Sequence, residues 1–357
     1  MLSANIPINK GNYSFDIKAR EELFHRKLGK GWERKYKLYR KRWQEYPKRQ
    51  FVSEYPLLID LELSTVCNLR CLMCYTTTDE FKRKSKARFM DYGLFCKIID
   101  EISGNVPAIR LSLRGEPTLH PRFLDCITYA KKKGIGEVSA LTNGTKLTKD
   151  FSKQIMRAGM DWLTISVDGL GKTYESIRKP AKFKDILQKI KYFKSLKKRD
   201  KTDKPVIKIQ SVWPAISHDP ERFYNTFFKY VDLIAFNPLI DYLGKDKNIT
   251  YEPNFICPQL YQRLVVGSDG KALMCSNDEH GNNIVGDTKK ERIYEIWHGK
   301  RINKIRAIHK RRNSFVPIPV CRKCYLPRAA ERTEKTKVNG RELIIRNYIG
   351  REQRIGE

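Results

Sequence analysis

From residue 57 onwards, short apolar runs rich in β-branched residues alternate with longer stretches whose apolar residues recur at helical spacing. The short runs predict six strands: Leu57–Leu63, Ile109–Leu113, Glu137–Leu141, Trp162–Val167, Val206–Val212 and Leu233–Phe236. The stretches between them predict helices: Tyr92–Ile102, Phe123–Lys133, Lys149–Ala158, Ile186–Lys197 and Glu221–Tyr230. Strand–helix units in this order predict an α/β fold with a parallel sheet, which right-handed crossovers curl into an open, partial barrel.

The regions on either side of this alternation have patterns of their own. Four aromatic residues recur at helical spacing within the basic stretch 18–50: Trp32, Tyr36, Tyr39 and Trp43. We expect one amphipathic helix that packs this aromatic stripe against the main domain while its lysines reach solvent. Contact with nucleic acid or with an anionic membrane is the alternative. Beyond Asn237 the chain is turn-rich, and it ends in a charged stretch with one strand-like run, Glu342–Tyr348.

These patterns divide the chain into four parts: residues 1–54, a basic N-terminal helical extension; 55–236, the partial barrel; 237–332, a small cysteine-rich domain; and 333–357, a charged tail. No run of eighteen apolar residues occurs, so we expect no membrane span. The first residues lack the basic start and apolar stretch of a signal peptide, which predicts a cytoplasmic protein. The net charge of +31 indicates attraction to an anionic partner, with solvated lysine-rich faces as the alternative.

Three cysteines follow the first predicted strand in the segment C-N-L-R-C-L-M-C: Cys67, Cys71 and Cys74. Because the cytoplasm keeps thiols reduced, closely spaced cysteines favour metal or cluster ligation over disulfides. Three thiolates can each bind one iron of a cubane cluster and leave the fourth iron open, as a reactive cluster requires. A structural zinc site is the weaker interpretation, since three cysteines leave it one ligand short.

This C-x3-C-x2-C spacing after the first strand of a partial barrel resembles the radical S-adenosylmethionine superfamily. The resemblance implies a partial (β/α)6 TIM-like barrel, a catalytic [4Fe–4S] cluster on the three cysteines, and bound S-adenosylmethionine. In that superfamily the cofactor is cleaved reductively, and the resulting 5′-deoxyadenosyl radical abstracts a substrate hydrogen. An electron donor such as flavodoxin or ferredoxin is implied as well.

Contacts to S-adenosylmethionine can be carried over onto residues at the ends of the predicted strands. R-G-E-P at 114–117 resembles the superfamily's G-G-E-P, which implies that Gly115 and Glu116 lie at the methionine ammonium. Arg114 replaces a glycine of that motif and is a candidate for contact with the substrate. The resemblance implies further contacts to the methionine, ribose and adenine groups: Asn143, Ser166, Arg178 and Gln210, of which Arg178 would pair with the methionine carboxylate.

Four further cysteines form a second set: Cys257-x12-Gly270-x4-Cys275, then Cys321-x2-Cys324. Gly270 lies between two predicted strands, Gln262–Val266 and Ala272–Met274, which predicts a hairpin. Four cysteines can ligate every iron of one cubane cluster, and zinc is the alternative. The spacing and the run Ile293–Trp297 resemble the SPASM domain over about residues 257–328 and imply a second [4Fe–4S] cluster. Since no cysteine follows Cys324, we expect only one auxiliary cluster.

Three other residues could take part in chemistry. Cys96 and Cys126 lie on predicted helices with apolar neighbours, which favours buried structural cysteine over a role as hydrogen donor. His120 follows the Glu116 loop, and we expect it to lie at the surface.

Together these features predict an enzyme that oxidises, epimerises or dehydrates an anionic small substrate, such as a nucleotide-activated or phosphorylated sugar. Peptide maturation is one alternative, although the first 55 residues show no β-hairpin signal of a leader-binding winged-helix module. RNA modification is another, and it depends on the basic aromatic stretch 18–50. A non-enzymatic cluster-binding protein would not need the Cys67, Cys71 and Cys74 set together with Glu116.

Overall fold

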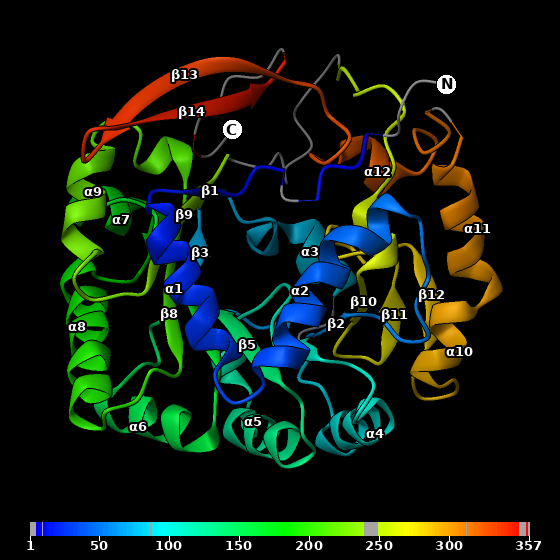
Figure 1. The fold of residues 1–357 in the computed structure, drawn as a ribbon, viewed down its shortest axis with the longest axis horizontal. Coiled ribbons are helices and arrows are strands. Elements are labelled where there is room, and N and C mark those ends of the chain that lie inside the picture. The colour runs from blue at the N-terminus through cyan, green and yellow to red at the C-terminus, as the bar shows by residue number, and fades with distance from the viewer. Residues whose placement is uncertain are drawn as a thin grey trace.

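The protein is described by a computed structural model that covers residues 5–8, 10–85, 88–238, 249–311, 313–349 and 355. Its central feature is a curved ten-stranded sheet with the strand order β1-β9-β8-β6-β5-β4-β2-β10-β11-β12 (Figure 1). The strands of this sheet are β1 (Tyr13–Ser14), β2 (Leu58–Leu61), β4 (Ala108–Arg110), β5 (Glu137–Thr142), β6 (Trp162–Ser166), β8 (Val206–Val212), β9 (Leu233–Asn237), β10 (Arg263–Val266), β11 (Lys271–Leu273) and β12 (Ile284–Asp287).

The six strands from β2 to β9 are those predicted from the sequence. Neighbours in the order β2-β4-β5-β6-β8-β9 all pair in parallel, which confirms the α/β partial barrel. One pairing was not predicted: β10 joins β2 in parallel, with Val265 opposite Asp60. The C-terminal region therefore extends the barrel sheet and does not form a separate layer.

Helices cover the convex face of the sheet (Figure 1). Those of the barrel are α3 (Asp79–Lys84), α4 (Tyr92–Ile102), α5 (Phe123–Lys132), α6 (Lys149–Ala158), α7 (Gly171–Ile177), α8 (Phe183–Arg199) and α9 (Pro220–Phe227). Those of the C-terminal region are α10 (Ile293–His298), α11 (Lys300–His309) and α12 (Pro319–Lys323). Helices α4 and α6 have the predicted bounds, and the Ile293–Trp297 run lies on α10 as expected.

Alternating residues of the parallel strands face the two sides of the sheet. Ile59 and Leu61 on β2, like Ile207 and Ile209 on β8, belong to the main hydrophobic core beneath the helices. Because side chains of a strand alternate between its faces, the residues between them point to the concave side. The concave side therefore presents polar residues such as Asp60, the residue between Ile59 and Leu61.

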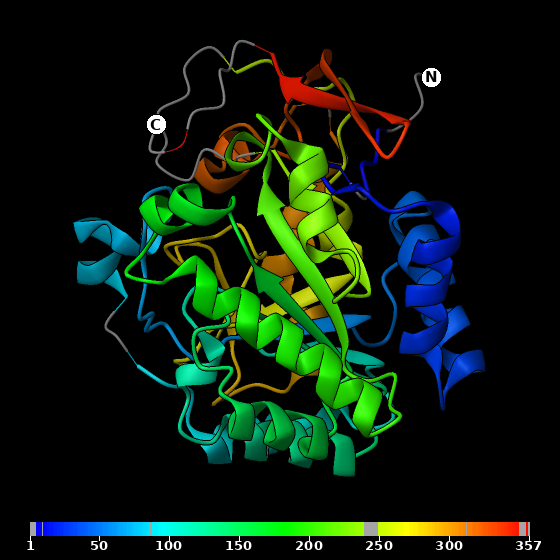
Figure 2. The same cartoon turned by 90° about the vertical axis from the view of Figure 1, so that its left-hand side faces the viewer.

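The N-terminal region forms two helices, so the expected single helix is wrong. Helices α1 (Lys18–Gly29) and α2 (Glu33–Lys48) are separated at Gly31, whose φ of 88° a right-handed helix does not allow. The expected packing is confirmed, since Tyr36, Tyr39 and Trp43 are buried in a second core cluster. That cluster includes the starts of β2, β4, β8 and β9, so the two helices close the amino end of the barrel (Figure 2).

The C-terminal stretch contains a hairpin where one strand-like run was expected. β13 (Ala330–Val338) pairs antiparallel with β14 (Arg341–Tyr348) beyond the carboxyl ends of the barrel strands (Figure 1). The charged tail predicted for 333–357 is therefore ordered at least as far as this hairpin. In the part of the chain that the structure describes, no helix is long and apolar enough to cross a membrane.

Candidate active site and auxiliary cluster site

The first cysteine set lies in the loop after β2, at the carboxyl ends of the parallel strands. Cys71 belongs to the short strand β3 (Arg70–Cys71), which pairs with β7 (Arg178–Lys179), and Cys74 precedes a 3-10 turn. All three thiols are free. Burial raises the pKa of Cys67, and it raises the pKa of Cys71 to about 12, with charge interactions among the three thiols acting in the same direction. The loop thus brings the three predicted ligands together.

The R-G-E-P segment after β4 packs directly on this cysteine loop. Gly115 N donates to Ser64 O at 3.2 Å, and Glu116 N donates to Val66 O at 2.8 Å. A Cβ atom on Gly115 would lie 2.4 Å from Ser64 O, a distance that side-chain carbons do not adopt. Only glycine therefore allows the two backbones to approach this closely.

The carboxylate of Glu116 is buried with polar neighbours on both sides. Oε1 accepts hydrogen bonds from Thr118 Oγ1 at 2.5 Å and from Thr142 Oγ1 at 2.6 Å, while Oε2 accepts from Asn143 N at 2.7 Å. Burial raises the pKa of Glu116. No lysine or arginine of the described chain pairs with this carboxylate, so Oε2 can accept a further bond from a cationic group.

Asn143 joins Glu116 to the cysteine loop, whereas Ser166 and Gln210 form a separate group. Asn143 Nδ2 donates to Asn68 Oδ1 at 2.9 Å and lies 3.9 Å from Cys67 Sγ. Ser166 and Gln210 are register partners on β6 and β8. Their assignment as contacts to S-adenosylmethionine stays a prediction.

Arg178 lies beside the cysteine loop because β7 pairs with β3. Its register partner is Cys71, and the two groups interact electrostatically. The guanidinium is also bound to Asp168, with Nε 2.8 Å and Nη2 2.7 Å from Oδ2. Asp168 thereby orients the arginine that was predicted to receive the methionine carboxylate.

Arg114 has a structural partner that the sequence did not reveal. Its guanidinium forms a bidentate ion pair with Glu62 at the end of β2, and Nη1 donates to Glu279 O at 3.3 Å. The side chain is almost fully buried. The suggested contact of Arg114 with substrate is therefore wrong, because this residue connects the barrel to the C-terminal region.

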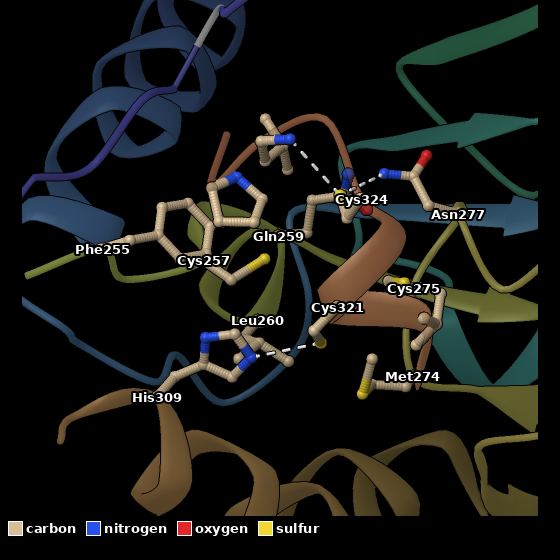
Figure 3. Close-up of a pocket in the computed structure, with 13 residues that line it drawn as sticks. Phe255, Cys257, Gln259, Leu260, Met274, Cys275, Asn277, His309, Cys321 and Cys324 are labelled. Carbon is tan, nitrogen blue, oxygen red and sulfur yellow. Dashed lines mark hydrogen bonds between the residues drawn. The ribbon is translucent and has the colours of Figure 1, made fainter. Parts of the chain in front are cut away.

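The second cysteine set lines one cavity, shown in Figure 3. Cys257 begins a 3-10 turn before β10, Cys275 follows β11, Cys321 lies on α12, and Cys324 caps the C-terminal end of that helix. Burial raises the pKa of Cys257 to about 12 and that of Cys324 to about 11. The predicted hairpin β10–β11 is also confirmed, and it carries Cys275 back towards Cys257.

Nitrogen donors surround the thiols of this cavity (Figure 3). Asn277 Nδ2 lies 3.1 Å from Cys324 Sγ, which also accepts from Leu326 N at 3.4 Å. His309 Nε2 lies 3.5 Å from Cys321 Sγ, and its ring stacks on Phe315. Burial lowers the pKa of His309 to about 4. Sequence analysis missed Asn277 and His309, because neither stands at a recognisable ligand spacing.

Both thiol sets have the chemistry that iron–sulfur clusters need. Buried thiols that raise one another's pKa resist deprotonation on their own, and a bound cluster would hold them as thiolates. The N–H groups of Asn277 and Leu326 donate to Cys324 Sγ, as N–H groups do to the sulfur of a cluster ligand. Among the described residues, no three His, Cys, Asp or Glu side chains converge closely enough to bind a single metal ion.

The other three candidates are structural. Cys126 is fully buried and Cys96 is partly buried against the same core, in agreement with the prediction. His120 is buried, with Nε2 2.8 Å from Met90 O, and its Nδ1 accepts from Arg122 N at 3.0 Å. The expected surface position of His120 is therefore wrong.

Both cysteine sets lie within regions that match known protein families. Residues 61–208 match the family model of the Radical SAM superfamily, and residues 257–325 match that of the SPASM iron–sulfur cluster-binding domain. The tungsten-containing aldehyde ferredoxin oxidoreductase cofactor-modifying protein of Pyrococcus furiosus is 34% identical over 142 residues, which is 35% of this chain and 38% of that protein. The AdoMet-dependent heme synthase of Methanosarcina barkeri is 30% identical over 135 residues, 34% of each chain.

Among solved structures, Streptococcus suis SuiB bound to precursor peptide SuiA has a TM-score of 0.58 at 14% identity. The match covers 76% of this chain and 71% of SuiB. This likeness shows the fold alone, and the chain spans little more than a third of the length of the two curated relatives. The two domains imply two [4Fe–4S] clusters and S-adenosylmethionine as cofactors.

Proposed function

The chain belongs to the radical S-adenosylmethionine superfamily and carries a C-terminal SPASM domain, and from this premise we propose that it modifies an anionic small molecule by hydrogen abstraction. A [4Fe–4S] cluster bound at Cys67, Cys71 and Cys74 would supply the electron that cleaves S-adenosylmethionine to methionine and a 5′-deoxyadenosyl radical. A flavodoxin or ferredoxin would reduce that cluster. The observation that carries the proposal is the meeting of the cysteine loop with Glu116, Asn143 and Arg178.

These residues would hold the methionine end of the cofactor. Glu116 Oε2 can accept one further hydrogen bond, from an ammonium N–H, in addition to the bond from Asn143 N. Burial strengthens such a charge-assisted hydrogen bond. Arg178 offers its guanidinium to a carboxylate while Asp168 fixes its direction. Gly115 keeps the Glu116 segment against the cysteine loop, so both partners stay at a fixed separation from the cluster ligands.

The second cysteine set would serve the redox part of the reaction. Four cysteines ligate all four irons of a cubane cluster, so no iron has an open coordination position for the substrate. Such a cluster would accept an electron from a substrate radical and make the net reaction an oxidation. The positions of Cys126, which is buried on α5, and of Cys96, which is partly buried on α4 against the same core, support this reading, since a thiol that returned a hydrogen would need to face the substrate.

A small anionic substrate has more support than either alternative. Both curated relatives are named for work on a cofactor or on heme, and the net charge of +31 favours an anion. RNA modification loses its main argument because the aromatic stripe of α2 is buried against the barrel. Peptide maturation rests on a likeness to SuiB that extends only to the fold.

The test is cofactor cleavage by a protein without the first cluster. We expect anaerobically reconstituted wild type to bind about eight irons and to form 5′-deoxyadenosine with dithionite. Replacement of Cys67, Cys71 and Cys74 by Ala should leave about four irons and abolish 5′-deoxyadenosine. The matched control is Cys96→Ala, which should keep both properties. Formation of 5′-deoxyadenosine by the triple variant would refute the proposal.

A further inference from the structure

The concave face of the barrel sheet carries polar and charged residues where a closed core would have apolar ones. Each lies between two strand residues that belong to the helix-side core, so its side chain points inward. The inward residues include Asp60, Arg110, Ser139, Thr164 and Lys208. By register, Asp60, Arg110 and Ser139 form one row that continues to Trp162, whereas Thr164 and Lys208 belong to the next row towards the carboxyl ends, opposite Leu141.

Lys208 is a buried cation with no anionic partner among the described residues. It is 8% exposed, and its Nζ lies 6.0 Å from the centre of the Trp162 ring. Burial lowers the pKa of this ammonium group to about 8, and no carboxylate contributes to the shift. The indole N–H of Trp162 is also buried without an acceptor. Two donors thus lie together with nothing to accept from them.

The opposite flank of the concave face also has surplus positive charge. Arg110 and Arg263 both bind Asp60, with Nη2 of Arg110 at 2.9 Å and Nη1 of Arg263 at 3.2 Å from Oδ2. One carboxylate therefore serves two guanidinium groups. Arg263 also stacks on Trp43 of α2. Arg110 makes a second contact to Asp60, with Nε 2.9 Å from Oδ1, but its side chain is 32% exposed against 15% for Arg263.

Parts of the concave face between these flanks are exposed to solvent. Leu141 is 39% exposed although it lies on β5, a central strand of the sheet. The side chain of Arg110 is 32% exposed in the same interior. Since the helices cover the convex face, these exposures lie on the concave side.

We propose that Lys208 and Arg110 form an oxyanion-binding floor inside the barrel, in which each cation receives one phosphate or carboxylate group of the substrate. This inference rests on the proposed function and names the part of the site that selects the substrate. A buried charge without a counter-ion costs several kcal/mol, so its retention is explained if a ligand supplies the missing anion. The lysine ammonium is a compact charge with rotatable N–H donors, and the arginine guanidinium is planar with paired N–H donors. Each can therefore bind a phosphate or a carboxylate group.

The positions of the two cations also indicate the extent of the ligand. β4 and β8 are separated by β5 and β6, which is three strand spacings or about 14 Å along the sheet. The curvature of the sheet shortens the direct distance. A substrate of nucleotide or cofactor size could therefore reach both flanks, whereas a single small ion could contact only one.

The test compares anion binding by Lys208→Met with that of the matched control Lys198→Met, an exposed lysine at the end of α8. Full-length, cluster-reconstituted proteins are titrated with inorganic pyrophosphate and, separately, with glutarate by isothermal calorimetry at about 0.15 M salt. We expect Lys208→Met to weaken the binding of at least one probe about tenfold or more, and Lys198→Met to match wild type. Tighter binding of pyrophosphate would indicate that the substrate group is a phosphate, and tighter binding of glutarate would indicate a carboxylate.

A second measurement uses the proteins without any probe. Since Lys208 lacks a counter-ion, Lys208→Met should unfold at a higher temperature than wild type. Equal binding of both probes by Lys208→Met and wild type, or a lower unfolding temperature of the variant, would overturn the anion floor. Cleavage of S-adenosylmethionine by wild type is measured separately. If wild type does not cleave the cofactor, the proposed function is refuted. If wild type cleaves the cofactor but anion binding does not depend on Lys208, only this inference is refuted.

Discussion

Gly115 is the position at which the smallest change should have the largest effect on the active site. Its N–H donates to Ser64 O, and the N–H of Glu116 donates to Val66 O, so two backbone bonds hold the R-G-E-P segment on the cysteine loop. Gly115→Ala would place a methyl group 2.4 Å from Ser64 O and 2.6 Å from Val66 O. Ordinary contacts begin near 3.4 Å, so the two segments must separate by about 1 Å.

The cost of this separation follows from the contacts that it breaks. Forcing a methyl group into a packed site costs about 1–3 kcal/mol. Loss or stretching of two backbone hydrogen bonds adds about 0.5–1.5 kcal/mol each. The total of about 2–6 kcal/mol falls on the loop that carries Cys67 and on the segment that carries Glu116, because both neighbours are backbone atoms that cannot rotate away.

The assay is iron content and 5′-deoxyadenosine formation after anaerobic reconstitution, together with thermal unfolding. We expect Gly115→Ala to lose most of the first cluster, to retain about four irons in the second, and to form little 5′-deoxyadenosine. Gly93→Ala at the start of α4 is the matched control, since its methyl group meets only Asp91 Oδ1, at 3.1 Å, and needs an adjustment of only a few tenths of an ångström. A Gly115→Ala protein with full iron content and wild-type cleavage would refute the reasoning.

Two further outcomes are expected. Glu116→Gln keeps the shape of the side chain but removes its charge, so binding of S-adenosylmethionine should weaken about tenfold or more in equilibrium dialysis; unchanged affinity would place the methionine ammonium elsewhere. His309→Phe keeps the ring beside Phe315 but removes the Nε2 contact to Cys321 Sγ, so the second cluster should have a lower reduction potential in an EPR-monitored titration. His309→Gln, which retains an N–H group, should lie closer to wild type, and equal potentials in all three proteins would contradict the assigned role.

The parts of the fold that depend on local sequence were predictable. Helix α4 begins after Asp91, whose carboxylate accepts from Leu94 N at 2.8 Å, and α6 ends at Gly159 with a φ of 89°. Capping residues of this kind stand beside the apolar pattern in the sequence, so both helices have the predicted bounds. The spacing of Cys67, Cys71 and Cys74 is equally local, because one loop carries all three, whereas Cys275 and Cys321 are brought together across β12, α10 and α11.

The parts that depend on distant partners could not be predicted. The pairing of β10 with β2 joins residues about 200 positions apart, and nothing in either strand specifies the other. Arg114 looked available for substrate because its partner Glu62 lies 52 residues earlier and shows no charge pattern with it. His309 likewise reaches Cys321 only through the fold of α11 and α12. Such contacts follow from tertiary packing, which periodicity does not encode.

The docking of both end regions on the barrel has a consequence for the order of folding. Lys10 binds Glu252 and Arg328 O, and Tyr13 contacts the backbone of Arg346, 333 positions later. At a synthesis rate of about 5–20 residues per second, Tyr13 waits about 17–67 s on the ribosome for this partner. Docking of the N-terminal segment must therefore be a late step, and insertion of the second cluster must also be late, because its ligand Cys324 is synthesised near the end of the chain.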